Sequence, residues 1–227
     1  MKRAPLFGTN VAAAMVAVGK AASTPVVLHL DHITKPELAM RAIELGFSSV
    51  MYDGSKLDFI ANVDTTKTVA DWGRKSGVWV EAELGEVGGK DGAHAPGVRT
   101  DPQEAARFAA DTGVDSLAVA VGSSHAMTTQ TAELDIDLIT RIHRAVPVPL
   151  VLHGSSGVPD SSIAAATRAG MWKINIGTAL NIAFTGEVRA WLTTNDGVDP
   201  RKYLVPAREA VANTVAHFLR VVAGEVD

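Results

Sequence analysis

Three histidines lie at the carboxyl ends of short apolar segments that are widely separated in the sequence. The segments are VVLHLDH (26–32), SLAVAVGSSH (116–125) and PLVLHG (149–154), and the histidines are His32, His125 and His153. Apolar, β-branched runs with polar residues at one end are typical of strands buried on both faces whose tips carry chemistry. In a parallel barrel, all strand tips share one face. Three imidazoles and an open position are the ligand set of a catalytic zinc ion, which we expect here.

Asp31 directly precedes the first of these histidines. Neighbouring side chains in a strand point to opposite faces, but where the backbone turns at a strand tip both can face a ligand. Asp31 would then be close enough to a metal-bound substrate to exchange a proton with its hydroxyl group. The structural alternative is that Asp31 caps the following helix.

Two loops have the composition of a phosphate site. HGSSGV (153–158) and NIGT (175–178) offer small hydroxyl groups, backbone N–H groups near a helix start, and glycines that include Gly154 and Gly177. Anion sites are built from such groups. Barrels bind phosphate after strands seven and eight, and these loops follow the last two strands that we predict. Plain strand-to-helix turns are the alternative.

Further polar residues lie at or near predicted strand ends. Asp53 and Glu83 are candidates for an alternative metal site or for hydrogen bonds to the histidines. Asp91 lies in the glycine-rich stretch 86–98, which could close over a site as a lid or be an ordinary surface loop, and it is an acid–base candidate. We interpret three other histidines as structural, His29 within a strand and His143 and His217 within helices.

Strands and helices alternate in the pattern of hydrophobic residues. We predict strands at 26–31, 48–53, 78–84, 116–121, 149–152 and 173–176, and helices at about 9–22 and at 35–46, 58–77, 101–113, 135–146, 159–170, 179–192 and 200–223. Such alternation predicts an α/β fold with a parallel sheet. Functional residues at many strand tips favour a (β/α)8 TIM barrel over an open sheet. Because a barrel needs eight strands, we expect residues 1–227 to form a single barrel domain that lacks the first two β/α units.

The composition is that of an ordinary globular domain. Among 227 residues, 47% are hydrophobic, 20% are charged, and the net charge is −4. This charge argues against nucleic acid or an anionic membrane as a partner. The absence of cysteine favours a cytoplasmic location, and no apolar stretch is long enough for a transmembrane helix. We interpret the Ala- and Val-rich amino terminus as a helix rather than a signal peptide.

A series of motifs resembles a known family. Six segments occur in this order: HLDH, SVMYDGSKLDF, VEAELGEVGG, TDPQEAARFAADTGVDSLAVAVGSSH, VPLVLHGSSGVP and KINIGTALNIAF. Together they resemble the class II, metal-dependent ketose-bisphosphate aldolases, most closely the fructose- and tagatose-bisphosphate branch. The resemblance implies a (β/α)8 barrel, bound Zn²⁺ and assembly into a homodimer or homotetramer.

The resemblance also implies roles for individual residues. His32, His125 and His153 would bind zinc, and Asp53 and Glu83 would form a second, displaced metal position. Asp31 would act on the C4 hydroxyl of the substrate and Asp91 on the proton at C3. Candidates for holding the phosphate of dihydroxyacetone phosphate are Gly154, Ser156, Asn175, Gly177 and Thr178. A monovalent cation, Na⁺ or K⁺, would lie near Gly122 and Ser123.

The expected activity is reversible cleavage of fructose or tagatose 1,6-bisphosphate to dihydroxyacetone phosphate and glyceraldehyde 3-phosphate, via a metal-stabilised enediolate. Alternatives are an aldolase for a 6-phospho-keto-sugar acid, a non-catalytic homologue that stabilises a partner subunit, and a zinc hydrolase. Ala126 and Gln130 depart from the pattern of the family, which leaves open how the phosphate is bound. The expected missing units would also contribute an asparagine and a serine to the substrate site.

Overall fold

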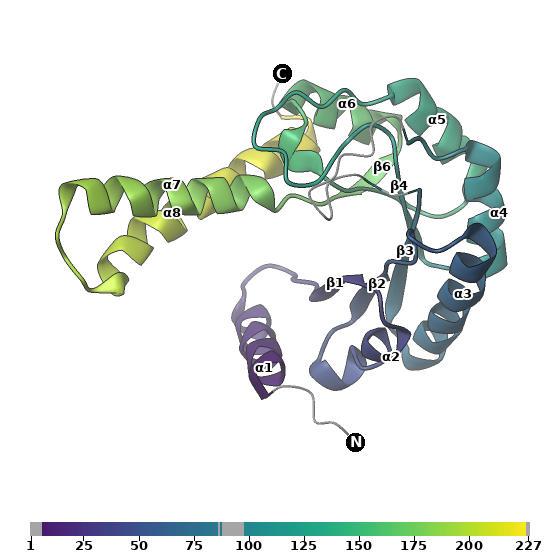
Figure 1. Ribbon diagram of the computed structural model, residues 1–227, viewed down its shortest axis with the longest axis horizontal. Helices are drawn as coiled ribbons and strands as arrows, with labels where there is room; N and C mark the ends of the chain where they lie inside the picture. Colours follow the sequence, from purple (N-terminus) through teal and green to yellow (C-terminus); the bar gives the residue numbers. More distant parts are fainter. Residues whose placement is uncertain (1–5, 86, 88–97, 226–227) are drawn as a thin grey trace. The chain divides into compact units, whose positions relative to one another are not determined.

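The computed structural model describes residues 6–85, 87 and 98–225 (Figure 1). The chain divides into two compact units. Unit 1 comprises residues 1–84, 103–118 and 146–148, and unit 2 comprises residues 85–102, 119–145 and 149–227. Each unit is described by itself below.

The described part of the chain contains six strands, and their order in the sheet follows their order in the sequence. The strands are β1 (His29–Ile33), β2 (Ser49–Tyr52), β3 (Trp79–Leu84), β4 (Ser116–Val119), β5 (Leu150–Leu152) and β6 (Met171–Ile174). Within unit 1, β1 pairs with β2 and β2 with β3, both in parallel. Within unit 2, β5 pairs with β6 in parallel. The predicted parallel α/β fold is therefore confirmed.

The first strand differs from its prediction. It begins at His29 rather than Val26, because pairing with β2 begins where His29 lies opposite Ser49. Val26 and Val27 precede this pairing and are exposed. His29 therefore lies at the start of β1 and not within it, and His32 lies inside the strand near its carboxyl end.

The helices of unit 1 form largely where the sequence predicts them. They are α1 (Leu6–Ala21), α2 (Pro36–Ala39), the 3-10 helix η1 (Ile43–Leu45), α3 (Phe59–Ser76) and most of α4 (Pro102–Thr112). Helix α3 begins where the Asp58 side chain accepts a hydrogen bond from the Ala61 N–H, and it ends at Gly77, whose φ is 68°. Aspartate at the start of a helix and glycine just past its end are residue types that these positions favour.

The single helix predicted over 35–46 is wrong. The segment forms α2 and η1, joined by tight turns in which the N–H groups of Arg41, Ala42 and Gly46 bond to carbonyl groups three residues earlier. Bonds of this spacing wind the backbone more tightly than an α-helix and rarely continue for long. Ala39 and Ala42 are fully buried on the inner side of this segment.

The core of unit 1 contains charged groups among apolar ones. Val50 and Met51 of β2 and Val80 of β3 are completely buried, yet so are the carboxylates Glu81 and Glu83 of β3. Burial of a carboxylate is unfavourable unless the group is paired or binds a cation. Two such groups in one strand therefore point to a polar site at this sheet.

Unit 2 contains α5 (Ile136–Ala145), the 3-10 helix η2 (Ser155–Gly157), α6 (Asp160–Ala169), α7 (Thr178–Thr194) and α8 (Pro200–Ala223). All four predicted α-helices are confirmed. Helices α7 and α8 lie side by side as a pair (Figure 1). The core cluster of this unit includes Val158 and Ile163 next to Phe218 and Val221 of α8. No described helix is both long and apolar enough to cross a membrane.

Candidate active site

A β-bulge in β1 presents the first candidate residues. Leu30 pairs with Val50 and Ile33 pairs with Tyr52, so that Asp31 and His32 together face the single intervening residue of β2. His32 has a φ of 49°, which is uncommon for a residue with a side chain. A bulge bends the strand and redirects side chains, and bulges are common beside active sites. The prediction from the sequence required such a turn of the backbone for the side chains of Asp31 and His32, which are neighbours in the chain, to face one ligand.

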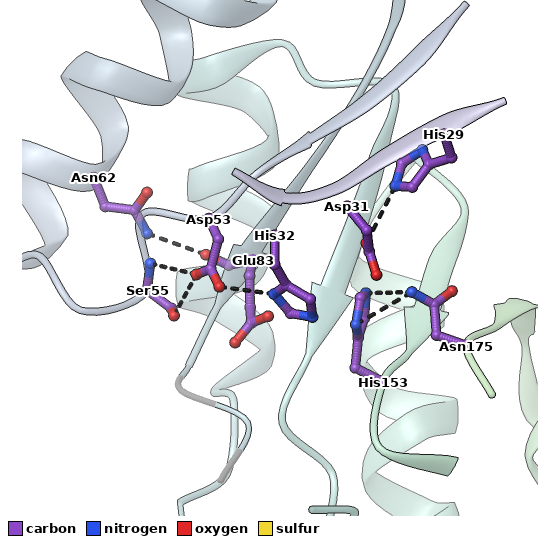
Figure 2. Close-up of polar contacts among 9 residues, drawn as sticks. All are labelled: His29, Asp31, His32, Asp53, Ser55, Asn62, Glu83, His153 and Asn175. Carbon is purple, nitrogen blue, oxygen red and sulfur yellow. Dashed lines mark hydrogen bonds and ion pairs between the residues drawn. The ribbon is translucent and has the colours of Figure 1, made fainter. Parts of the chain in front are cut away.

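Asp53 fixes the ring of His32 (Figure 2). Its Oδ2 atom lies 2.8 Å from His32 Nδ1, and its Oδ1 atom accepts hydrogen bonds from Ser55 N–H at 3.2 Å and from Ser55 Oγ–H at 2.6 Å. Because an ionised carboxylate only accepts, Nδ1 of His32 carries the proton. A metal ion would then be bound through Nε2. Histidine ligands of metals usually have such a carboxylate behind them.

Glu83 brings a second carboxylate to the same place. Ligand atoms of His32, Asp53 and Glu83 all lie within 4.8 Å of one another. Asn62 of α3 holds the end of β3, because its Nδ2 donates to the main-chain oxygen of Glu83 at 3.1 Å and its Oδ1 accepts from Thr66 Oγ1 at 2.9 Å. Unit 1 thus brings together one imidazole and two carboxylates, a donor set suited to a divalent cation.

Unit 2 contains the other two histidines that the sequence predicts as metal ligands. The rings of His125 and His153 have centroids 5.8 Å apart and planes inclined at 58°. Two imidazoles on one tetrahedral zinc have centroids roughly 5 Å apart, so this pair is close to the required spacing. His153 follows β5 and is fully buried. His125 lies in a turn beyond β4, which ends at Val119 rather than at the predicted residue 121.

A glycine permits this close approach. Gly154 has a φ of 67°, and a Cβ atom there would lie 2.6 Å from the main-chain carbon of Ser124. The main chains on either side of the histidine pair are therefore in contact, and only glycine fits. Asn175 follows β6, and its Nδ2 atom lies 3.3 Å from each ring nitrogen of His153 (Figure 2).

The two loops predicted to bind phosphate are neighbours within unit 2. The N–H of Ser155 donates to the Asn175 main-chain oxygen at 3.4 Å, and the Ala179 N–H donates to Ser156 Oγ at 3.0 Å. Gly177, which is exposed, is the N-cap of α7, and Thr178 is its first residue. The helix has no acidic residue in its first turn, so its positive end would favour an anion.

Other candidates have mixed outcomes. Asp31 lies in β1, and the N-cap of the next helix is Lys35, so the helix-capping alternative for Asp31 is wrong.

Ser123 is buried, and its Oγ has no hydrogen-bond partner within the described part of unit 2. Burial raises the pKa of Tyr52, and the Asp53 carboxylate acts in the same direction, so Tyr52 stays neutral near pH 7. Asp91 lies outside the described residues.

Comparison with known proteins identifies the family. The sequence model of the family "Fructose-bisphosphate aldolase class-II" matches residues 3–225. The chain belongs to this family. The predicted resemblance is confirmed, and the protein is an aldolase, a carbon–carbon lyase.

Three solved structures are similar to this class II aldolase. The YdjI aldolase from Escherichia coli K12 has 34% sequence identity and a TM-score of 0.82, over 94% of this chain and 75% of that one. A protein from Coccidioides immitis assigned as a fructose-1,6-bisphosphate aldolase has 28% identity and a TM-score of 0.85, over 96% and 78%. The fructose-bisphosphate aldolase of Campylobacter jejuni, at 24% identity, a TM-score of 0.79 and coverages of 96% and 76%, is similar in fold.

Sequence analysis of this aldolase missed three supporting residues. In the sequence alone, Asn62 is not distinguished from other helical residues, and Ser55 is not distinguished from other turn residues. His29, interpreted as structural, lies 3.3 Å from Asp31. Only the i, i+2 spacing of His29 and Asp31 in a predicted strand could have suggested that contact.

Proposed function

We propose that the protein is a zinc-dependent aldolase that reversibly cleaves fructose or tagatose 1,6-bisphosphate to dihydroxyacetone phosphate and glyceraldehyde 3-phosphate. The observation that carries the proposal is the carboxylate–imidazole pair of the buried Asp53 and the half-buried His32, since such a pair is the usual support of a metal-binding histidine. Membership of the aldolase family supports the reaction class.

The proposed zinc ligands are His32, His125 and His153. Glu83 and Asp53 would form an alternative position for the ion. When bound, zinc would act as a Lewis acid that stabilises the negative charge developing on the three-carbon fragment. A monovalent cation, Na⁺ or K⁺, is proposed near Gly122 and Ser123.

Asp31 is the proposed base for cleavage. It removes the proton of the C4 hydroxyl, the C4 oxygen becomes the aldehyde carbonyl, and the electron pair of the C3–C4 bond passes to the three-carbon fragment. Asp91 is the proposed acid that returns a proton to C3. The Asp31 side chain is 44% exposed, as a group that meets a substrate should be.

The phosphate of the three-carbon fragment is proposed to bind at the two adjoining loops of unit 2. The contributing residues would be Gly154, Ser156, Asn175, Gly177 and Thr178. The positive end of α7 and the glycine backbone favour a phosphate here. Ser156 Oγ accepts a hydrogen bond from the Ala179 N–H, so the hydroxyl proton of Ser156 is the group that would donate to the phosphate.

The direct test combines metal analysis with a substrate panel. Purified protein should contain zinc and release dihydroxyacetone phosphate from one of the two bisphosphates, and EDTA should abolish the release. Asp31→Ala should keep zinc and lose turnover, whereas His153→Ala should lose both. A protein that holds no zinc, or cleaves neither bisphosphate, would contradict the proposal. Cleavage of a 6-phospho-keto-sugar acid alone would establish the alternative substrate class.

We further propose that residues 1–227 form one domain of the (β/α)8 barrel type, which assembles into a homodimer or homotetramer in the cytoplasm. Light scattering after gel filtration gives the oligomeric state. A single cooperative transition in denaturant would support one domain, and two separate transitions would contradict it.

A further inference from the structure

We propose that His29 is a positioning residue that holds the carboxylate of Asp31 for proton transfer, with Ser49 fixing the ring of His29. This inference rests on the proposed function, because it concerns the residue assigned there as the base. His29 itself is not expected to touch the substrate.

The geometry links three side chains of unit 1. His29 Nδ1 lies 2.6 Å from Ser49 Oγ, and His29 Nε2 lies 3.3 Å from Asp31 Oδ1 (Figure 2 shows the second contact). His29 and Ser49 are register partners in β1 and β2, so their side chains emerge side by side on the same face. Asp31, two residues after His29, shares that face.

The contact of His29 Nε2 with Asp31 Oδ1, at 3.3 Å, is an ion-pair contact. Because a carboxylate only accepts, this approach is favourable when Nε2 of His29 carries the proton. In the neutral ring Nδ1 is then an acceptor, and the hydroxyl of Ser49 donates to it. Ser49, which is buried, thereby anchors the ring of His29 in the orientation in which Nε2 faces Asp31.

The bulge explains why Asp31 needs such support. Regular pairing of β1 is interrupted between Leu30 and Ile33, so the ladder does not fix the backbone of Asp31 as it fixes that of His29. The side chain of Asp31 is also the most exposed of the three. A side-chain contact from an anchored imidazole therefore limits the rotamers of Asp31, which is how a base is kept within reach of its proton.

The third group nearby also bears on the role of His29. Ligand atoms of His29, Asp31 and Glu81 lie within 4.8 Å of one another, and Glu81 is buried. Two carboxylates this close repel each other. The Nε2–H of His29 offers Asp31 a donor, which favours one orientation of its carboxylate. A metal ion held by these three residues is the competing explanation.

The test compares His29→Ala with the conservative His29→Gln, whose side-chain amide can still donate to Asp31. The exposed His143→Gln of α5 is the matched control. For His29→Ala we expect kcat to fall roughly 10- to 100-fold with KM and zinc content unchanged, because the base is misplaced rather than removed. His29→Gln should recover part of this loss, and Ser49→Ala should show a smaller loss in the same direction.

A partial reaction separates positioning from a structural role. Exchange of the C3 proton of dihydroxyacetone phosphate with D2O needs the acid–base group at C3 but not the base at C4. His29→Ala should therefore keep this exchange while cleavage falls. If exchange, cleavage and zinc content fall together, or if kcat equals that of His143→Gln, the inference is wrong. Zinc falling from two ions per chain to one in His29→Ala would establish the metal site instead.

A substrate-free measurement keeps this inference distinct from the proposed function. Side-chain ¹⁵N NMR should find His29 in the Nε2–H tautomer, with a shift that changes in Asp31→Asn. An Nδ1–H tautomer, or no response to Asp31→Asn, would overturn the inference even in an active enzyme. A wild-type protein without aldolase activity would contradict the proposed function, whereas this measurement decides the His29–Asp31 contact in either case.

Discussion

His32 Nδ1 and Asp53 Oδ2 lie 2.8 Å apart, and Ser55 holds the other oxygen of that carboxylate. Asp53→Ala removes the acceptor that fixes the ring of His32, and zinc affinity should fall by roughly 10- to 100-fold. Asp53→Asn keeps an acceptor but loses the charge, so its loss should be smaller. Competition with a chromogenic chelator measures both variants. The exposed Asp64→Asn of α3 is the control, and equal affinities for all three variants would contradict the support role.

Gly154 should tolerate no side chain. In Gly154→Ala the Cβ would lie 2.6 Å from the main-chain carbon of Ser124, at a φ of 67°, so the segment bearing His125 must move. We expect a stability loss of about 1–3 kcal/mol and weaker zinc binding. Gly186→Ala in α7 is the matched control, because nothing lies within 4 Å of its added methyl group. Denaturant unfolding measures both variants, and a neutral Gly154→Ala would contradict the close approach.

Asn62 joins α3 to the end of β3. Asn62→Ala leaves the main-chain oxygen of Glu83 without this donor and removes the acceptor of Thr66 Oγ1. Because these groups are buried, the free energy of unfolding should fall by about 1–3 kcal/mol. Asn195→Ala, at the exposed end of α7, should have a much smaller effect on the midpoint of denaturant unfolding. Similar shifts for the two variants would indicate that the buried network adds nothing.

Metal removal should lower thermal stability. A ligand present at about 100 times its Kd stabilises the folded state by about 2.7 kcal/mol, so stripping zinc with EDTA should lower Tm, and added zinc should restore it. His153→Ala should have a lowered Tm that EDTA hardly changes. Scanning calorimetry of both proteins, with and without chelator, provides the measurement. A wild-type Tm that does not respond to EDTA would argue against a bound zinc.

Tyr52 should make the protein sensitive to alkali. Burial raises the pKa of Tyr52 above its ordinary 10.0, so the folded state binds this proton more tightly than the unfolded state does. The resulting stability is fully present below pH 10.0 and is lost as the pH rises through the folded pKa. Tyr52→Phe should therefore flatten the fall in stability on the alkaline side. Urea midpoints across this range, with Tyr203→Phe as control, test the assignment.

Much of the fold follows from the sequence because its signals are local. Helix α8 forms over the predicted residues, with Asp199 as its N-cap and Gly224 as its C-cap. The break between α2 and η1 was not predicted, because it depends on how closely Ala39 and Ala42 pack inside unit 1. The bulge in β1 was not predicted either, because it is a property of the pairing with β2 and not of β1 alone.

The candidate site, like the fold, was predicted from the sequence only in part. Residue type and strand-end position indicated Asp53 and Glu83, and unit 1 brings both to His32. The contact of His29 with Ser49 depends on strand register, which hydrophobic periodicity does not reveal. Asn62 acts through a carbonyl group far along the chain, so no neighbouring residue signals its role.

The extra residue in β1 makes chain length, as well as residue identity, a requirement at this point. Deleting one residue between Leu30 and Ile33 would restore an even ladder with β2. The one residue left between them would then alternate strictly with its neighbours in the strand. The even ladder thus has room for only one of the two groups, the aspartate or the histidine. A shortened variant that kept every other residue would thus lose either its base or a metal donor.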